Sequence, residues 1–190
     1  MLVANCTLPI EKWVAKISIV YVAPKLSGCY FYGVKIQFWS IGKNHDPFIK
    51  DAVEDFSKRI GKYFSTEWNI IPVPKNTGMM SEMDLKKKEG EMILSWLKPQ
   101  DFFVALDERG KEMTSEQLAT FIQTRANEST KNLVFVIGGA FGLGANVLQK
   151  ADYKWSLSKL TFPHQLARLI LVEQVYRACT IIRNEKYHHR

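Results

Sequence analysis

An apolar run that leads directly into a glycine loop is the feature that most constrains what this chain can fold into. Residues 133–137 (Leu-Val-Phe-Val-Ile) have the composition of a buried strand, and the glycine-rich residues 138–144 follow at once. Glycine allows main-chain N–H and C=O groups to approach a ligand closely. A second loop, residues 157–163, contains Ser, Thr and Pro and leads into an apolar helix that begins at His164. Two loops of this kind at neighbouring strand ends predict one small-molecule site.

The glycine loop fits neither of the common nucleotide-binding motifs. Its glycines are spaced G-G-x-x-G-x-G, whereas dinucleotide-binding folds use G-x-G-x-x-G with an acidic residue about 20 positions later. The P-loop motif requires Gly-Lys-Ser/Thr, and here Gly144 is followed by Ala145 and Asn146. Hydride transfer and NTP hydrolysis therefore have little support, and a plain strand-to-helix turn stays an alternative interpretation of the loop.

Composition favours one domain, or one domain with an appendage, and a polyanionic partner. The 190 residues are 46% hydrophobic, and the net charge of +7 favours nucleic acid. The three cysteines (Cys6, Cys29 and Cys179) contain no C-x-x-C pair, so neither a disulfide framework nor a metal site is indicated. No apolar run reaches the roughly 18 residues of a membrane span, so we expect a cytoplasmic protein with no membrane partner.

Residues 1–33 differ from the rest of the chain and leave three interpretations open, because a regular alternation of strand and helix patterns begins only at Val34. They could form a genuine extension, such as a short hairpin. They could reflect a start site placed upstream of the true initiator. They could also be an export signal, because residues 26–29 resemble a lipoprotein cleavage box. Pro24 and Lys25 interrupt the apolar run just before that box, which disfavours the third interpretation.

Beyond Val34 the sequence alternates between strand and helix patterns. Strands are expected at residues 35–41, 68–73, 102–106, 133–137 and 153–157. Helices are expected at residues 47–60, 82–97, 115–127 and 164–182. This alternation indicates an α/β layered fold with a mostly parallel sheet. Ligands bind outside the carboxyl ends of strands in such sheets, so we expect the loops 106–111, 138–144 and 157–163 to converge.

The final helix pattern, residues 164–182, is apolar on more than one side. One stripe runs through Ala167, Leu171 and Val175, and a second through Val172 and Cys179. Such a helix is either deeply buried or part of a subunit interface. We favour the interface, because a terminal helix has few neighbours in its own chain, and this predicts a homodimer through the C-terminal helix.

Several blocks of residues 34–190 resemble the ribosomal RNA large subunit methyltransferase H family, small members of the SPOUT class of knotted methyltransferases. The most specific are residues 155–165 (Trp-Ser-Leu-Ser-Lys-Leu-Thr-Phe-Pro-His-Gln) and 173–178 (Glu-Gln-Val-Tyr-Arg-Ala). Shorter matches lie at residues 34–36, 41–43, 88–90, 106–107, 110–111, 135–139, 142–143 and 187–188. The family pattern begins with Met where Val34 stands, which favours a start placed too far upstream, and residues 1–33 receive no function from the resemblance.

The resemblance implies a C-terminal trefoil knot that binds S-adenosylmethionine, and a homodimer. It also implies methylation of N3 of a pseudouridine in helix 69 of 23S ribosomal RNA, on the assembled 70S ribosome. When the family's cofactor contacts are transferred residue by residue, they fall on Leu106, Gly138, Leu157, Ser158, Lys159, Leu160, Thr161 and Phe162. These contacts lie in the loops that we expect to converge.

Four polar residues are candidates for the chemistry. The N3–H of the target base is weakly acidic, so a base or an electrostatic stabiliser would assist methyl transfer. His164 begins the last helix, and the alternative to a catalytic role is a local hydrogen bond at the start of that helix. Arg168 could hold a phosphate or shield the dimer seam. Tyr187 and His188 lie on the tail, which in a dimer could reach the partner's site.

For the other charged residues a structural role is favoured over a functional one. Glu173 and Arg177 are four residues apart and are expected to pair along the helix. Residues 86–88 are three lysines that could touch RNA, but Glu89 and Glu91 interrupt the charge and favour a solvated helix face. A non-catalytic ribosome- or RNA-binding factor would use the same basic surface without a cofactor. A dinucleotide oxidoreductase would bind NAD or FAD instead, so cofactor binding discriminates among the alternatives.

Overall fold

A computed structural model describes residues 33–74, 80–128 and 130–187. Within them the strands are β1 (Lys35–Ile41), β2 (Ser65–Ile71), β3 (Asp101–Glu112), β4 (Asn132–Ile137) and β5 (Tyr153–Ser156). The helices are α1 (Pro47–Ile60), α2 (Glu82–Trp96), α3 (Ser115–Asn127), α4 (Ala145–Lys150) and α5 (His164–Ile182). Apart from Gly33, the doubtful extension lies outside the described residues, as does His188.

The strands form one sheet in the order β2-β1-β4-β3-β5, and every pairing in it is parallel. The α/β fold with a parallel sheet is therefore confirmed. β1 and β4 lie side by side near the centre of the sheet, and almost all of their residues are buried or half-buried. All carboxyl ends point to one edge, which is the edge where the predicted loops begin.

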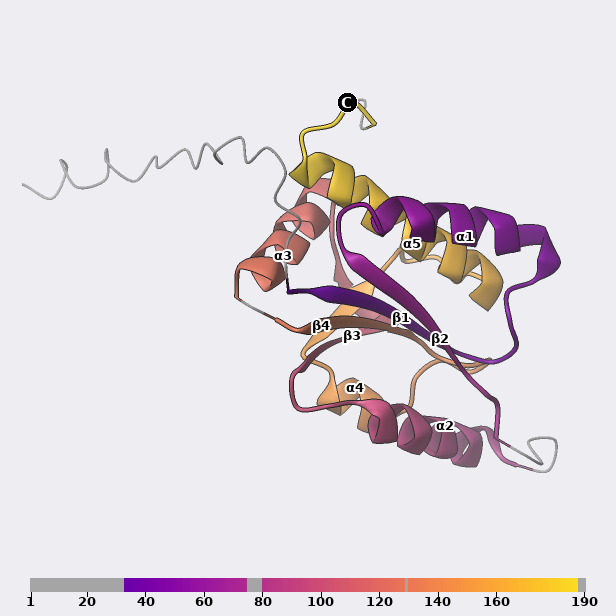
Figure 1. Cartoon of the computed structure of the whole chain (residues 1–190). Coiled ribbons are helices and arrows are strands. Elements are labelled where there is room, and N and C mark those ends of the chain that lie inside the picture. The colour runs from indigo at the N-terminus through magenta and orange to yellow at the C-terminus, as the bar shows by residue number, and fades with distance from the viewer. Residues whose placement is uncertain (1–32, 75–79, 129, 188–190) are drawn as a thin grey trace, which may run out of the picture.

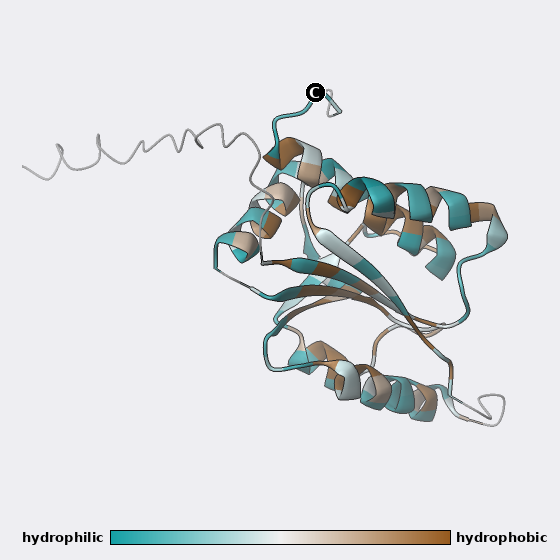
Figure 2. Ribbon diagram, viewed as in Figure 1, coloured by the Kyte–Doolittle hydropathy of each residue, from teal (hydrophilic) through white to brown (hydrophobic). Residues whose placement is uncertain are grey.

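Helices cover both faces of the sheet and make three layers (Figure 1). α1, α3 and α5 lie on one face, and α2 and α4 on the other. Side chains of successive strand residues point alternately to the two faces of the sheet and pack into two hydrophobic cores. Phe135 packs with the first group of helices, and Val134 and Val136 pack with the second. In Figure 2 brown, apolar residues run along the strands, while teal residues predominate on the outer side of α1.

Two helix starts follow the sequence closely. Asp46 caps α1 by accepting a hydrogen bond from Phe48 N at 2.9 Å, and Pro47 occupies the first helical position. Thr114 caps α3 in a capping box, because Gln117 N donates to its hydroxyl at 3.2 Å and its own N–H donates to the Gln117 side chain at 2.9 Å. Both caps fix the direction in which the chain leaves the sheet.

The structure corrects the bounds of two elements and adds a third that was not predicted. β2 begins at Ser65 and ends before Pro72, which has no N–H to donate. β3 does not stop at Leu106, since an irregularity between Leu106 and Lys111 lets its pairing with β5 resume. The short helix α4 has no counterpart among the predicted elements; it begins after Gly144 without a side-chain cap.

The surroundings of α5 correct the reason for placing it in an interface. The helix packs against both α1 and α3 within its own chain, and Leu171, Val172, Val175 and Cys179 are fully buried there. Both apolar stripes are thus explained by the core of one chain, and the homodimer stays a prediction. Within the described residues, no helix combines the length and apolar content needed to cross a membrane.

Candidate active site

A cavity of about 1300 Å³ lies at the carboxyl ends of β3, β4 and β5. The glycine loop contributes residues 137–146, β3 contributes residues 106–109, and the loop after β5 contributes most of residues 157–164. The three loops expected to converge therefore do so. α2 closes one side with Glu82, Met83, Lys86 and Lys87.

The cofactor contacts implied by the resemblance fall almost entirely on this cavity. The residues among them that line it are Leu106, Gly138, Leu157, Ser158, Leu160, Thr161 and Phe162. Lys159 is exposed to solvent and does not line it. The loop after β5 is shaped by its own serines, because Ser156 Oγ donates to Ser158 O at 2.8 Å and Leu160 N donates to Ser158 Oγ at 3.0 Å.

The glycine loop turns back on itself at the floor of the cavity. Gly142 N donates to Gly139 O at 3.0 Å, and Gly142 has a φ of +79°, in the region that favours glycine. A Cβ atom on Gly138 would lie 2.6 Å from the carbonyl carbon of Gly142 and 2.8 Å from Leu143 N. A side chain at position 138 would therefore force the loop open, so only glycine fits at the point where the strand enters this turn.

Glu89, on α2, is a residue of the site region that sequence reasoning assigned only to a solvated face. Its side chain is 4% exposed, and burial raises the pKa of its carboxyl above the ordinary value. A Cβ atom on Gly139 would lie 2.5 Å from both of its carboxyl oxygens, so Glu89 lies directly against the glycine loop. The sequence contained one signal for this burial: Glu89 lies four residues from both Leu85 and Ile93, and this spacing places it on the buried side of the helix.

His164 and Arg168 occupy different places although they lie one turn apart on α5. His164 lines the cavity, and burial together with the positive charge of Arg168 lowers the pKa of His164 below 6.5. Arg168 is 1% exposed and does not line the cavity. Its Nε donates to Ser40 Oγ at 2.9 Å and its Nη1 to Lys43 O at 3.0 Å. Within this chain Arg168 therefore holds the β1–α1 loop.

Comparison with known proteins decides the family. Residues 34–188 match the family model described as predicted SPOUT methyltransferase. The chain belongs to the SPOUT methyltransferases. A ribosomal RNA large subunit methyltransferase H from Cytophaga hutchinsonii is 44% identical over 156 residues, which cover 82% of this chain and 100% of the relative. Its namesake from Christiangramia forsetii is 46% identical over 155 residues, or 82% of this chain and 99% of the relative.

The solved structure of the SpoU methyltransferase AviRb from Streptomyces viridochromogenes, in complex with AdoMet, aligns with a TM-score of 0.38 and 14% identity. That alignment covers 76% of this chain and 57% of AviRb. The sequence relatives and the family model thus establish that this chain is a methyltransferase with the SPOUT-type α/β fold.

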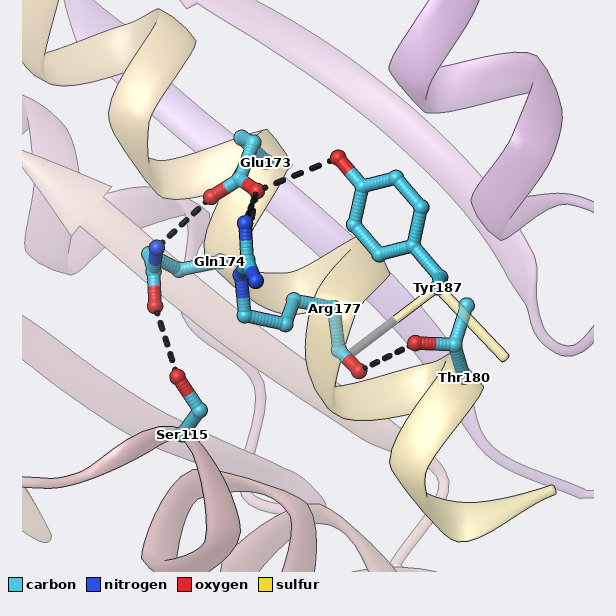
Figure 3. A network of polar contacts seen from close by, with 6 residues as sticks. All are labelled: Ser115, Glu173, Gln174, Arg177, Thr180 and Tyr187. Carbon is cyan, nitrogen blue, oxygen red and sulfur yellow. Dashed lines mark hydrogen bonds and ion pairs between the residues drawn. The ribbon is translucent and has the colours of Figure 1, made fainter. Parts of the chain in front are cut away.

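Tyr187 of this SPOUT methyltransferase lies away from the cavity of its own chain, in a polar network on α5 (Figure 3). Its hydroxyl donates to Glu173 Oε1 at 3.3 Å, and the guanidinium of Arg177 lies 5.2 Å from the centre of its ring. Arg177 Nε donates to the same carboxylate at 3.1 Å, which confirms the predicted pair. The network extends through Gln174 to Ser115 on α3. It fixes the point from which the C-terminal tail leaves α5.

Proposed function

We propose that this methyltransferase transfers a methyl group from S-adenosylmethionine to N3 of a pseudouridine in helix 69 of 23S ribosomal RNA, on the assembled 70S ribosome. The observation that supports it most is that all but one of the implied cofactor residues line one cavity. The relatives that are 42–46% identical carry the name of a large-subunit ribosomal RNA methyltransferase. Residues 34–190 form the proposed catalytic domain.

The cavity fits S-adenosylmethionine chemically. Its volume exceeds that of a typical small-molecule pocket, roughly 300–1,000 Å³, and its floor is a glycine turn in which Gly138 has no room for a side chain. The indole N–H of Trp155, a lining residue, has no hydrogen-bond partner among the described residues. Buried donors are nearly always paired in folded proteins, so this N–H marks a part of the wall that a ligand acceptor would complete once the side chain shifts toward the cavity.

Methyl transfer requires little from the protein beyond alignment. When bound, S-adenosylmethionine supplies a methyl group that carries its own leaving group. The surrounding loops would hold donor and acceptor in line, which can supply much of the rate acceleration. His164 lines the cavity and its pKa is lowered, so its imidazole is neutral at neutral pH and can accept the N3 proton of the target base.

The proposal includes a homodimer in which the tail of one chain reaches the cavity of the other. Tyr187 lies outside the cavity of its own chain, so a role for Tyr187 and His188 in substrate binding requires a partner chain. Phe141 and Leu160 line the cavity and are 49% and 70% exposed. Such apolar exposure beside a polar site suits a second subunit. The C-terminal trefoil knot belongs to the same proposal.

The deciding experiment mixes the purified protein with labelled S-adenosylmethionine and 70S ribosomes that lack the modification, and locates the methyl group by mass spectrometry. The expected result is one methyl group on a pseudouridine of helix 69. Gly138→Ala serves as the control that has lost the cavity floor. Cofactor binding without transfer would contradict the proposed target, whereas absence of both would favour a ribosome-binding protein without catalytic activity.

A further inference from the structure

Glu89 combines deep burial with a position beside the cavity. It lies one turn after Lys86 and two turns after Glu82, and both of these residues line the cavity. The helix packs closely there, because a Cβ atom on Gly90 would lie 2.7 Å from the side-chain amide of Asn146 at the start of α4. Glu89 is therefore held against the glycine loop by the packing of its own helix.

The carboxyl of Glu89 has no partner within the described part of the chain. No hydrogen bond or ion pair to it is present there. Lys86, one turn earlier on the helix, is paired with another carboxylate, since its Nζ lies 2.9 Å from Glu82 Oε1. A buried carboxyl without a partner is unfavourable in a folded chain. The presence of this carboxyl on an otherwise apolar helix face indicates that a bound ligand supplies its partner.

The side chain of Glu89 points at the glycine loop. Both carboxyl oxygens lie where a side chain of Gly139 would otherwise stand, and Gly139 is one of the residues that line the cavity. Only the hydrogen atoms of this glycine separate the carboxyl from the loop surface. Glu89 is not itself one of the lining residues, but its carboxyl stands directly behind Gly139, where α2 meets the glycine loop.

We propose that Glu89 is the anionic subsite that receives the α-ammonium of S-adenosylmethionine. This inference rests on the proposed function. The cofactor has two cationic centres, but only the ammonium carries N–H donors, and a carboxylate accepts such donors in strong, charge-assisted hydrogen bonds. The sulfonium needs no acceptor. Glu89 accordingly recognises the amino-acid portion of the ligand and takes no part in methyl transfer itself.

Isothermal titration calorimetry with three nucleosides tests the assignment. S-Adenosylmethionine and S-adenosylhomocysteine contain the ammonium, whereas 5′-methylthioadenosine lacks the amino-acid portion. Glu89→Gln should weaken binding of the first two by about tenfold or more, as expected for loss of one partner of a buried charge pair, and leave the third within about twofold. Glu91→Gln, the same change at an exposed position of α2, should leave all three affinities unchanged.

A ligand variant tests the same contact without altering the protein. S-Adenosylhomocysteine without its amino group should bind the wild-type protein about tenfold more weakly than the parent compound, and Glu89→Gln should bind the two equally. Equal affinities on the wild type would overturn the assignment. So would a Glu89→Gln variant that weakens all three nucleosides alike, because the residue would then only support the loop.

Failure of this inference is distinguishable from failure of the proposed function. A wild-type protein that binds none of the nucleosides would remove the proposed function together with the inference. A wild-type protein that binds S-adenosylmethionine and methylates ribosomes, with an insensitive Glu89→Gln variant, would remove only the role of Glu89. Thermal unfolding of the variant, unchanged from the wild type, shows that the comparison is made on folded protein.

Discussion

Two glycines of one loop show how differently a single methyl group acts at the residue scale. A Cβ atom on Gly138 meets backbone atoms of Gly142 at 2.6 Å, and backbone cannot move aside as the end of a flexible side chain can. Gly142 has nothing within 4 Å of the corresponding position, and its only constraint is a φ of +79°. The first position is limited by space, and the second only by backbone conformation.

We therefore predict that Gly138→Ala abolishes binding of S-adenosylmethionine, because the cavity floor cannot form around the added carbon. Gly142→Ala should retain binding and lower the free energy of unfolding by about 1 kcal/mol, the strain of a left-handed non-glycine residue. Calorimetry and chemical denaturation of the two variants measure both effects. Equal loss of binding in both would show that loop flexibility, and not space at position 138, controls the site.

His164 gives the second residue-scale prediction. Burial and the charge of Arg168 lower its pKa below 6.5, so the imidazole gains its proton only as the pH falls through that lowered value. If it accepts the N3 proton, the rate of methyl transfer should fall over the same acidic range. His164→Gln should slow transfer by about 100-fold and remove this pH dependence. Single-turnover rates between pH 5 and 8 measure it, and an unchanged profile in the variant would exclude His164 as the base.

At the scale of elements, Arg168 links α5 to the loop between β1 and α1. Its guanidinium bonds to Ser40 Oγ and to the carbonyl of Lys43, and it is almost wholly buried. Arg168→Met would leave these acceptors unpaired, and we predict a loss of about 2–4 kcal/mol in the free energy of unfolding. Urea denaturation measures the loss. Lys50→Met, which removes an exposed pair with Glu54, should leave the midpoint unchanged.

The elements also show which parts of the fold and site were predictable. Helix starts with strong caps, such as Asp46-Pro47 and Thr114, were predictable because their signals are local. The continuation of β3 beyond Leu106 depends on pairing with β5, which lies far along the chain. α4 was missed because six residues contain too few helical turns to show a period.

The candidate site divides in the same way. The convergence of three loops follows from the rule that parallel strands end at one edge, and the cavity confirmed it. The burial of Arg168 and Glu89 depends on which helices cover them, a tertiary property that residue spacing alone does not determine. The matched blocks of sequence supplied the family, whereas the glycine loop alone left several ligands open.

At the scale of the whole molecule, the match to the family begins at residue 34, and Val34 is 4% exposed in the core. A chain that begins with Met in place of Val34 should therefore retain the core. We predict that its rate of ribosome methylation and its thermal stability equal those of the 190-residue chain. A truncated chain that fails to fold or to methylate would show that residues 1–33 belong to the catalytic domain.

The proposed dimer makes a sharper prediction about how two chains share one site. Tyr187 lies outside the cavity of its own chain, so each active site would combine the cavity of one chain with the tail of the other. Gly138→Ala alone lacks a functional cavity, and a chain that ends at Lys186 lacks the tail. We expect each to be inactive by itself.

When equal amounts are unfolded and refolded together, half of the dimers contain one chain of each kind, and one of the two sites in such a dimer pairs an intact cavity with an intact tail. Methylation should therefore recover to about a quarter of the wild-type rate, since two-fold symmetry gives each dimer two equivalent sites. A mixture that stays inactive, while native mass spectrometry shows that mixed dimers have formed, would mean that the tail serves the cavity of its own chain. Recovery would place the substrate across the dimer seam and explain why the polar network of Glu173 and Arg177 fixes the start of the tail.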